Sequence, residues 1–588
     1  MRSFFKYVLA TVTGITIVVI LFFAVIIGLI MSTVSQMGSG KEIDVPSNAV
    51  LYVSLNHAIT ERTSENPLDG LNVPGYSDAK SLGLNDIIGR IAAAKDDSRI
   101  KGIYLNPTYV NTGMASLKEI RDALLDFKKS GKFVVAYSDS YTQKAYYLAS
   151  VADKIYVNPE GALEFNGLSS SIAFVKDALQ KLGIEMQVVK VGTYKSAVEP
   201  FILNEMSAAN RLQVTAYLES LYGSFLKNIS EGRKISVDSL RHIADNYLVR
   251  NADDAVRYKF VDGKLYKDEL LAELKKRLKV EKKKDVPSVS LLDYVGSSGK
   301  EQTGDRVAVV YAYGDIVDGE GSDNNIGGDR FSRELRKLRT DDRVKAVVLR
   351  VNSPGGSALA SDIIAREVEL IKAVKPVVVS MGDYAASGGY YISALADSIF
   401  AERETLTGSI GVFGLIPNLQ GLLNNKLGVR FDEVKTGKYA GLMSSPDKPL
   451  SEEEKAIIQA EVNRIYGTFT GKVAKGRNMA VSAVESIGQG RVWTGNQALQ
   501  NGLVDGVGDI QRAIKAAAAK AKLENYRLVY YPNAKDPFSS LLGTSKEKIK
   551  AWMLGDELGE YRQYVEQLQT ITRSSGIQAR MPYTIEIR

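Results

Sequence analysis

The stretch Val379–Tyr391 holds a serine in a setting suited to nucleophilic chemistry. It reads Val-Ser-Met-Gly-Asp-Tyr-Ala-Ala-Ser-Gly-Gly-Tyr-Tyr, so Ser387 is flanked by Ala385–Ala386 and Gly388–Gly389, which keep bulky side chains away. Backbone N–H groups at the start of a helix favour negative charge, and such a place can generate an alkoxide and hold an oxyanion. Taken alone, a small-residue turn that packs a helix against a sheet explains these residues better. The rest of the chain changes that balance.

A serine hydroxyl is a weak nucleophile and needs a base to take its proton. The chain has two histidines, His57 and His242, and no cysteine. The chain therefore has too few histidines to favour a Ser-His-Asp triad or a histidine-rich metal site, and the absence of cysteine excludes thiol catalysis. A neutral lysine amine is the available candidate. Its pKa must fall from ~10.4 toward ~7–8, a shift that burial against apolar walls can supply.

The chain carries a tandem duplication, which helps to identify that lysine. Residues 96–107 return around Arg343, which repeats Arg99 244 residues later, and residues 189–194 return as 434–439 at an offset of 245. Each half alternates apolar strands with amphipathic helices. This pattern predicts βαβ units around a mostly parallel sheet, repeated once.

The two halves have lost complementary residues. Ser387 aligns with Gln143, so the first half lacks the nucleophile, and Lys195 aligns with Ala440, so the second half lacks the lysine. Two degenerate half-sites make one complete site if the halves face each other. Without the duplication, an exposed loop lysine would be the better interpretation of Lys195.

Two further runs in the second half suit the same chemistry. Asn352–Gly356 follows the predicted strand Val344–Val351, and its glycines let backbone N–H groups approach a substrate carbonyl. Leu406–Gly411 contains Ser409, which can hydrogen-bond a lysine amine. A Pro-Gly turn and a turn serine are the structural alternatives.

The elements that position these residues can be predicted from apolar periodicity. Pro376–Ser380 is predicted as a buried strand and Tyr390–Asp397 as a helix, so Ser387 lies where a strand passes into a helix. Beyond residue 523, a strand over Tyr526–Tyr531 and a helix over Glu547–Thr570 are predicted without counterparts in the first half. That tail caps the sheet or mediates assembly.

The amino-terminal segment predicts a membrane anchor. Tyr7–Met31 is 25 residues long and carries no charge, and as a helix it would span ~37 Å, more than the ~30 Å hydrocarbon core. Arg2 and Lys6 precede it, so we expect the N-terminus in the cytoplasm and the bulk of the chain across the membrane. A long, cleaved signal peptide is the alternative. The net charge of +7 in 588 residues does not indicate a nucleic-acid partner.

Five segments are expected. They are a cytoplasmic stub with the anchor (1–45), a first α/β repeat carrying the lysine (46–284), a linker (285–305), a second α/β repeat carrying the serine (306–524) and a C-terminal extension (525–588).

Four runs taken together resemble the signal peptide peptidase A family, in its long, duplicated, membrane-anchored bacterial form. They are Asn352–Gly356, Met381–Tyr391, Leu406–Gly411 and Gly192–Pro200. The resemblance covers nearly the whole chain from the anchor to about Lys522. It implies an α/β fold like that of the Clp protease and crotonase groups, a serine protease with a Ser/Lys dyad, and no cofactor or metal.

The resemblance also assigns roles. Ser387 is the nucleophile, Lys195 the general base and Ser409 the residue that orients the lysine, while Gly356 and Gly388 form the oxyanion hole. The implied substrates are remnant signal peptides and other hydrophobic peptides, and the implied assembly is a homo-oligomer, a tetramer, in the inner membrane with its bulk on the periplasmic side. Two other functions are open at this point: a crotonase-like acyl-CoA enzyme and a catalytically silent membrane scaffold.

Overall fold

The computed structural model describes most of the chain after the first 44 residues. The described residues are 6–7, 10–18, 20–21, 45–63, 82–296, 304–322, 324–442, 446–532 and 576–581. Most of the predicted anchor, Tyr7–Met31, and all of the predicted helix Glu547–Thr570 lie outside them. Among the described helices, none combines the length and the apolar character needed to cross a bilayer.

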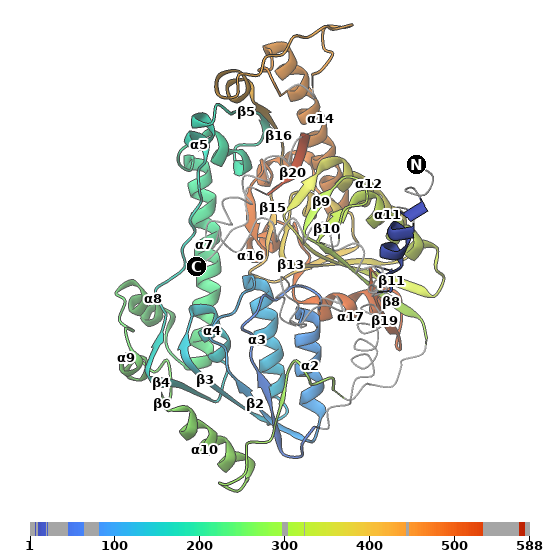
Figure 1. Cartoon of the computed structure of the whole chain (residues 1–588). Helices are drawn as coiled ribbons and strands as arrows, with labels where there is room; N and C mark the ends of the chain where they lie inside the picture. Colours follow the sequence, from blue (N-terminus) through green and yellow to red (C-terminus); the bar gives the residue numbers. More distant parts are fainter. Residues whose placement is uncertain are drawn as a thin grey trace.

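The first half forms a sheet of six parallel strands in the order β6-β4-β3-β2-β1-β7 (Figure 1). Helix α10 packs on one face, and α2, α3, α4 and α7 to α9 pack on the other. The strands are β1 Ala49–Val53, β2 Ile100–Leu105, β3 Phe133–Tyr141, β4 Lys154–Leu163, β6 Gly263–Lys264 and β7 Ser288–Ser290. The helices are α2 Leu84–Asp96, α3 Met114–Lys128, α4 Gln143–Ala149, α7 Ala208–Arg233, α8 Val237–Asp245, α9 Ala252–Arg257 and α10 Lys267–Leu278.

The second half repeats this arrangement. Its sheet runs β17-β15-β13-β11-β8-β19, and β14 joins β13 to β18. The strands are β8 Arg306–Tyr313, β11 Val344–Ser353, β13 Val377–Ala386, β14 Ser398–Ala401, β15 Leu406–Gly408, β17 Val492–Thr494, β18 Gly506–Val507 and β19 Arg527–Tyr531. The helices are α11 Gly328–Thr340, α12 Ala358–Lys372, α13 Gly388–Ser393, α14 Glu452–Arg477, α15 Val481–Ile487, α16 Gly495–Gln500 and α17 Ile510–Lys520.

The predicted α/β class and its duplication are confirmed, because the two sheets share one strand order. One expectation about the tail is wrong. The strand predicted at Tyr526–Tyr531 is β19, and it does have a counterpart: β19 pairs with β8 as β7 pairs with β1, parallel and at the sheet edge. Strand β7 lies inside the segment predicted as a linker. The segment boundaries themselves stay predictions.

A third sheet joins the two halves, in the order β10-β9-β12-β20-β16-β5. Strand β5 of the first half pairs antiparallel with β16 of the second over seven residues, from Val191 opposite Val412 to Glu185 opposite Asn418. Helices α5 (Lys176–Lys181) and α6 (Glu199–Ile202) flank β5. The other strands are β9 Asp315–Val317, β10 Asn325–Gly327, β12 Gly355–Ser357, β16 Val412–Asn418 and β20 Gly576–Arg580.

A buried charge cluster also ties the halves together. Arg350, on β11, donates from Nε to Glu61 Oε2 at 2.9 Å and from Nη2 to Glu119 Oε1 at 2.7 Å. All three side chains are buried. Burial raises the pKa of Glu119 to about 8, so the carboxylate form of this residue depends on the nearby guanidinium of Arg350.

Removing the arginine should therefore destabilise the whole protein. We expect Arg350→Met to lower the free energy of unfolding by about 3–5 kcal/mol, because it leaves a buried carboxylate without its partner. Denaturant unfolding followed by circular dichroism measures this. The matched control is Arg333→Met, which removes an arginine paired with Glu320 at the surface and should leave the midpoint nearly unchanged. Equal shifts in both variants would contradict the structural role of Arg350.

Candidate active site

Ser387 lies at the junction of β13 and α13, as the sequence predicts. Its backbone has φ 54° and ψ −111°, a conformation that a residue with a side chain adopts at a cost of about 1–3 kcal/mol. The conformation is held by hydrogen bonds: the Ser387 N–H donates to the Gly408 carbonyl at 2.7 Å, and the Tyr391 N–H donates to the Ser387 carbonyl at 2.8 Å. The junction is also tight, since a methyl group on Gly389 would lie 2.6 Å from the Ser353 carbonyl oxygen.

Lys195 reaches Ser387 from the other half of the chain. Its segment follows β5, which pairs with β16 of the second half, and the Tyr194 N–H donates to the Gln489 carbonyl at 2.9 Å. A methyl group on Gly490 would lie 2.7 Å from Lys195 Cα, so this approach requires glycine at position 490. The Lys195 Nζ lies 2.8 Å from Ser387 Oγ.

The environment of Lys195 favours the neutral amine. Both Lys195 and Ser387 have an exposed fraction of 0%. Burial lowers the pKa of Lys195 well below its ordinary value, because the charged form loses its hydration in an apolar interior. The aromatic ring of Phe413, 6.0 Å from Nζ, is one such apolar wall.

Ser409 contacts the amine of Lys195 with two groups. Its Oγ lies 3.1 Å and its carbonyl oxygen 3.2 Å from Lys195 Nζ. A neutral amine has two N–H groups and one lone pair, so the two groups of Ser409 can accept both hydrogens and leave the lone pair for the hydroxyl of Ser387. Ser409 is itself held at φ 49° by its N–H, which donates to the Arg491 carbonyl at 2.7 Å.

Gln213, on α7, fixes the backbone next to the lysine and joins it to the second half. Its Nε2 donates to Ser196 Oγ at 2.7 Å and to the Tyr194 carbonyl at 3.1 Å. Its Oε1 accepts from the Val492 N–H at 3.2 Å. No local pattern marks this residue, because its partners beside the lysine and in the second half lie 17 to 279 positions away along the chain.

The glycine loop lies against the serine junction. Gly355 has φ 98° and Gly356 has φ 156°. A methyl group on Gly355 would lie 2.6 Å from the Gly388 nitrogen, and one on Gly356 would lie 1.9 Å from the Ile316 carbonyl oxygen. The glycine loop therefore packs directly against the backbone of Gly388, and side chains at positions 355 and 356 would prevent this packing.

Strand β20 lies in the groove beside this loop. It pairs antiparallel with β12 on one side and with β16 on the other, so the chain supplies an extended peptide next to Ser387. Ala579 pairs with Gly356, and a methyl group on Gly388 would lie 3.0 Å from the Ala579 carbonyl oxygen. Nothing in the sequence marks this element, since the five residues of β20 carry no motif and their partners lie more than 150 positions away.

The structure thus brings together every residue singled out for chemistry in the sequence. Ser387, Lys195 and Ser409 form one hydrogen-bonded group, with Gly356 and Gly388 beside it. Gln143 and Ala440, the residues that replace serine and lysine in the other copies, lie elsewhere. Gln143 Nε2 donates to the Gly167 carbonyl at 2.8 Å within the first half, and Ala440 lies in a turn on the surface.

Several known proteins are similar to this chain. A family model described as Peptidase family S49 matches residues 126–281 and 369–524, one match in each half. Protease 4 of Haemophilus influenzae is 37% identical over 512 residues, which cover 82% of this chain and 80% of that protein. Protease 4 of Salmonella typhi is 36% identical over 533 residues, covering 88% and 86%.

Similarity extends to a plant protein and to a solved structure. The chloroplastic serine protease SPPA of Arabidopsis thaliana is 32% identical over 550 residues, covering 91% of this chain and 78% of that protein. A ClpP1 mutant from Listeria monocytogenes aligns with 35% of this chain and 94% of its own at 16% identity, with a TM-score of 0.24.

Proposed function

This chain belongs to peptidase family S49 and is a serine protease, and we propose that it degrades remnant signal peptides with a Ser/Lys dyad shared between its two halves. One observation carries the proposal. Two fully buried side chains 192 positions apart, Lys195 and Ser387, approach to 2.8 Å at a strained junction beside a glycine loop. A structural role alone does not account for an amine buried in this way.

In the proposed mechanism, the neutral Nζ of Lys195 takes the hydroxyl proton of Ser387 as Oγ attacks the substrate carbonyl. The N–H groups of Gly356 and Gly388 stabilise the oxyanion that forms. The lysine, now charged, gives its proton to the leaving amine. Ser409 keeps Nζ aimed at Oγ throughout, and a water molecule activated by the same lysine then releases the acyl group.

An extended peptide fits the groove between β12 and β16. Strand β20 already takes this position with antiparallel pairing on both sides, which is how a sheet edge binds an added strand. Such binding reads the backbone and the alternate side chains, and it needs an unfolded substrate. Released signal peptides meet this requirement, and one relative, from Enterococcus faecium, is named a putative signal peptide peptidase.

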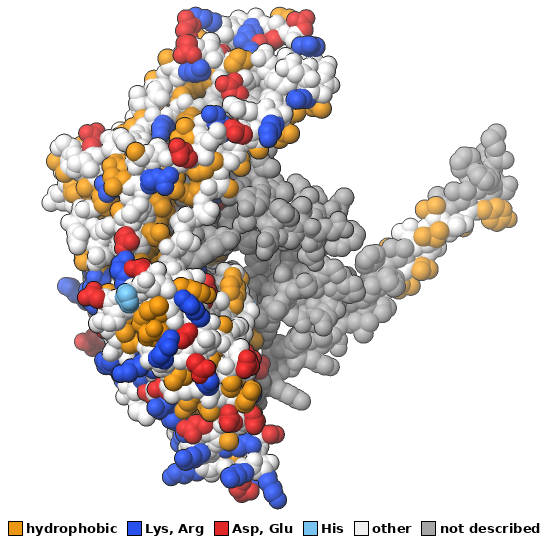
Figure 2. All heavy atoms as spheres, turned by 90° about the vertical axis from the view of Figure 1, so that its left-hand side faces the viewer, with side chains coloured by type: hydrophobic (Ala, Val, Ile, Leu, Met, Phe, Trp, Pro, Cys, Tyr) orange, Lys and Arg blue, Asp and Glu red, His pale blue; other side chains and the backbone are white. Residues whose placement is uncertain are grey.

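The setting of the enzyme is part of the same proposal. The segment Tyr7–Met31 would anchor the chain in the inner membrane, with the catalytic bulk on the periplasmic side, and each half would take a fold like that of Clp proteases and crotonases. Assembly into a homo-oligomer has support in large apolar side chains that stay exposed near β5 and α5, among them Leu182, Leu427, Val429 and Phe431. Figure 2 shows apolar side chains at the surface of this side of the molecule.

The two competing functions lack comparable support. The chemistry of a crotonase-like acyl-CoA enzyme does not require the Lys195–Ser387 pair. A catalytically silent scaffold does not require a serine held in a strained backbone conformation. Calorimetric titration with an acyl-CoA analogue would detect the first by a binding signal.

A peptide assay tests the proposed function. We expect the purified full-length protein, in detergent, to cut a synthetic signal peptide into fragments identified by mass spectrometry, while a folded globular protein of mixed sequence stays intact. Intact signal peptide after prolonged incubation, with the protein folded by circular dichroism, would contradict the proposal.

A further inference from the structure

Strand β20 shows which peptide bond would face the nucleophile. Ala579 is opposite Gly356, and its carbonyl oxygen would lie 2.2 Å from a methyl group on Gly355 and 3.0 Å from one on Gly388. This carbonyl therefore lies at the candidate oxyanion hole. By this register, the residues up to Ala579 correspond to the part of a substrate before the cut bond, and Arg580 and Met581 correspond to the part after it.

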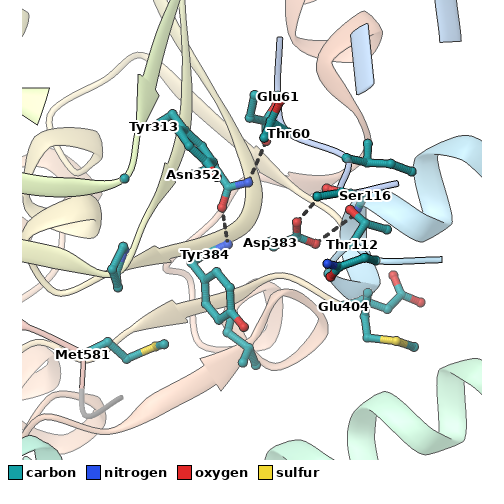
Figure 3. A pocket seen from close by; sticks show the side chains of 18 of the residues that line it. Thr60, Glu61, Thr112, Ser116, Tyr313, Asn352, Asp383, Tyr384, Glu404 and Met581 are labelled. Atoms are coloured by element: carbon teal, nitrogen blue, oxygen red, sulfur yellow. Dashed lines mark hydrogen bonds between the residues drawn. The ribbon is translucent and has the colours of Figure 1, made fainter. Parts of the chain in front are cut away.

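The two residues after this point leave the groove toward a cavity between the halves. Arg580 Nη2 lies 3.0 Å from Asp315 Oδ2, at the start of β9. The Met581 N–H donates to the Pro354 carbonyl at 2.7 Å, and the Met581 side chain lines the cavity (Figure 3). The part of a bound substrate that follows the cut bond would therefore be directed into this cavity.

The cavity has a volume of about 470 Å³, and both halves line it. Four carboxyl groups belong to its lining: Glu61, Asp315, Asp383 and Glu404. Two buried lining atoms, Thr112 Oγ1 and Glu404 Oε2, have no hydrogen-bond partner among the described residues. Buried polar atoms without partners are rare in folded proteins, so a polar ligand fits this space better than an apolar one.

The four carboxyl groups of the lining differ in the partners that they already have. Glu61 is paired with Arg350. Burial raises the pKa of Glu404, which favours its uncharged form. Asp383 accepts from the Ser116 N–H and hydroxyl, as Figure 3 shows. Asp315 is paired with Arg580 of β20, a residue that a bound substrate would displace.

One cation also belongs to the lining. Lys144, aligned with Gly388 in the duplication, donates from Nζ to the Thr112 carbonyl at 2.9 Å. It lies with Thr112 on the side formed by the first half, whereas Asp315 lies on the side formed by β9. The side of the cavity nearest the cut bond is therefore the side that carries the carboxylate of Asp315.

We propose that this cavity is the subsite for the substrate residues after the cut bond, and that Asp315 selects a basic side chain at the first of them. This inference rests on the proposed function. The favoured substrates are extended peptides in which a small residue, like Ala579, is followed by arginine or lysine. The protein itself carries this sequence, Ala579-Arg580, at the same position in β20.

A set of three quenched fluorescent peptides tests the inference with the full-length protein. They share one sequence, and only the residue after the expected cut changes, from Arg to Ala to Glu. We expect the ratio of kcat/KM for the Arg and Glu peptides to be about fivefold or more, the size of effect that a partly exposed ion pair can give. Mass spectrometry must place the cut directly before the varied residue in each peptide.

Charge variants at position 315 separate selection from a structural role. Asp315→Asn should reduce the Arg/Glu ratio to near one, and Asp315→Lys should invert it, which a merely damaged groove would not do. The matched control is Asp342→Asn, which removes an exposed carboxylate outside the cavity lining and should keep the wild-type ratio.

The outcomes distinguish this inference from the proposed function. If the wild type cuts none of the three peptides, the proposed function fails. If it cuts all three at equal rates, or if the ratio does not change in Asp315→Asn and Asp315→Lys, the protease stands and the subsite is wrong.

Discussion

Ser387→Ala should abolish peptide hydrolysis, with kcat lowered by at least about 10⁴-fold. The methyl side chain of alanine cannot form the acyl bond, and the loss of the nucleophile leaves only binding and the oxyanion hole, which retain a small part of the catalysis. The fold should tolerate the change, since only a hydroxyl is removed and Lys195 keeps its two contacts with Ser409. Peptide cleavage and denaturant unfolding measure the two effects.

A buried serine nearby provides the control. Ser393, on α13, is buried and donates to the Gly389 carbonyl at 2.7 Å, so Ser393→Ala removes a similar hydroxyl without touching the dyad and should keep most of the activity. A fluorophosphonate probe should label the wild type and Ser393→Ala but not Ser387→Ala. Near-normal hydrolysis by Ser387→Ala would remove this serine from the mechanism.

Lys195→Arg should be as inactive as Lys195→Ala, with losses of at least about 10³-fold. Arginine keeps a positive charge but cannot be deprotonated in a protein, so it cannot accept the serine proton. A third variant, Lys195→Met, fills the same buried space without charge. It should fold at least as well as the wild type and still be inactive, which separates the loss of the base from the loss of packing.

The pH profile gives an independent test of the lysine. Below its pKa in the free enzyme, Lys195 is protonated and cannot act as a base; above it, the amine is neutral. Since burial lowers this pKa well below the ordinary value, kcat/KM should rise with pH through the lowered pKa and level off before pH ~10.4, where an exposed lysine titrates. A substantial rate for Lys195→Arg, or a profile that rises only near pH 10, would show that another group is the base.

The parts of the site predicted from the sequence are those with a local signature. Gly355 and Gly356 indicate a backbone requirement, and the structure gives them φ 98° and 156°. The small residues around Ser387 indicate close packing, and a methyl group on Gly389 would lie 2.6 Å from the Ser353 carbonyl oxygen. Lys195 has no such signature. It was found because the duplication allowed the two copies to be compared, and because histidine and cysteine were nearly absent as alternatives.

The duplication also shows where a sequence match fails to give matching structure. Residues 189–194 and 434–439 are similar in sequence, yet Val189 is 6% exposed within β5 while Val434 is 97% exposed in irregular chain. A strand forms where a neighbour offers free backbone groups. Strand β16 pairs with β5, and no strand among the described residues pairs with 434–439.

Contacts between distant segments leave no local pattern in the sequence. Strand β20 occupies the groove because β12 and β16 each present an unpaired edge there, and neither edge can be recognised before the fold is known. The same holds for Asp315, whose position relative to the cut bond depends on three strands from separate parts of the chain.

The division of the dyad between the halves has a consequence for how the protein is made and how it has evolved. During synthesis the first half emerges with Lys195 but with Gln143 at the position that aligns with Ser387, so by the proposed mechanism an incomplete chain cannot hydrolyse its neighbours. By the proposed mechanism, activity appears only when the second half has folded and β16 has paired with β5. If Ser387 and Lys195 form the dyad, deletion of either copy removes one of its members, and a gene of single-copy length derived from this one would encode an inactive protein.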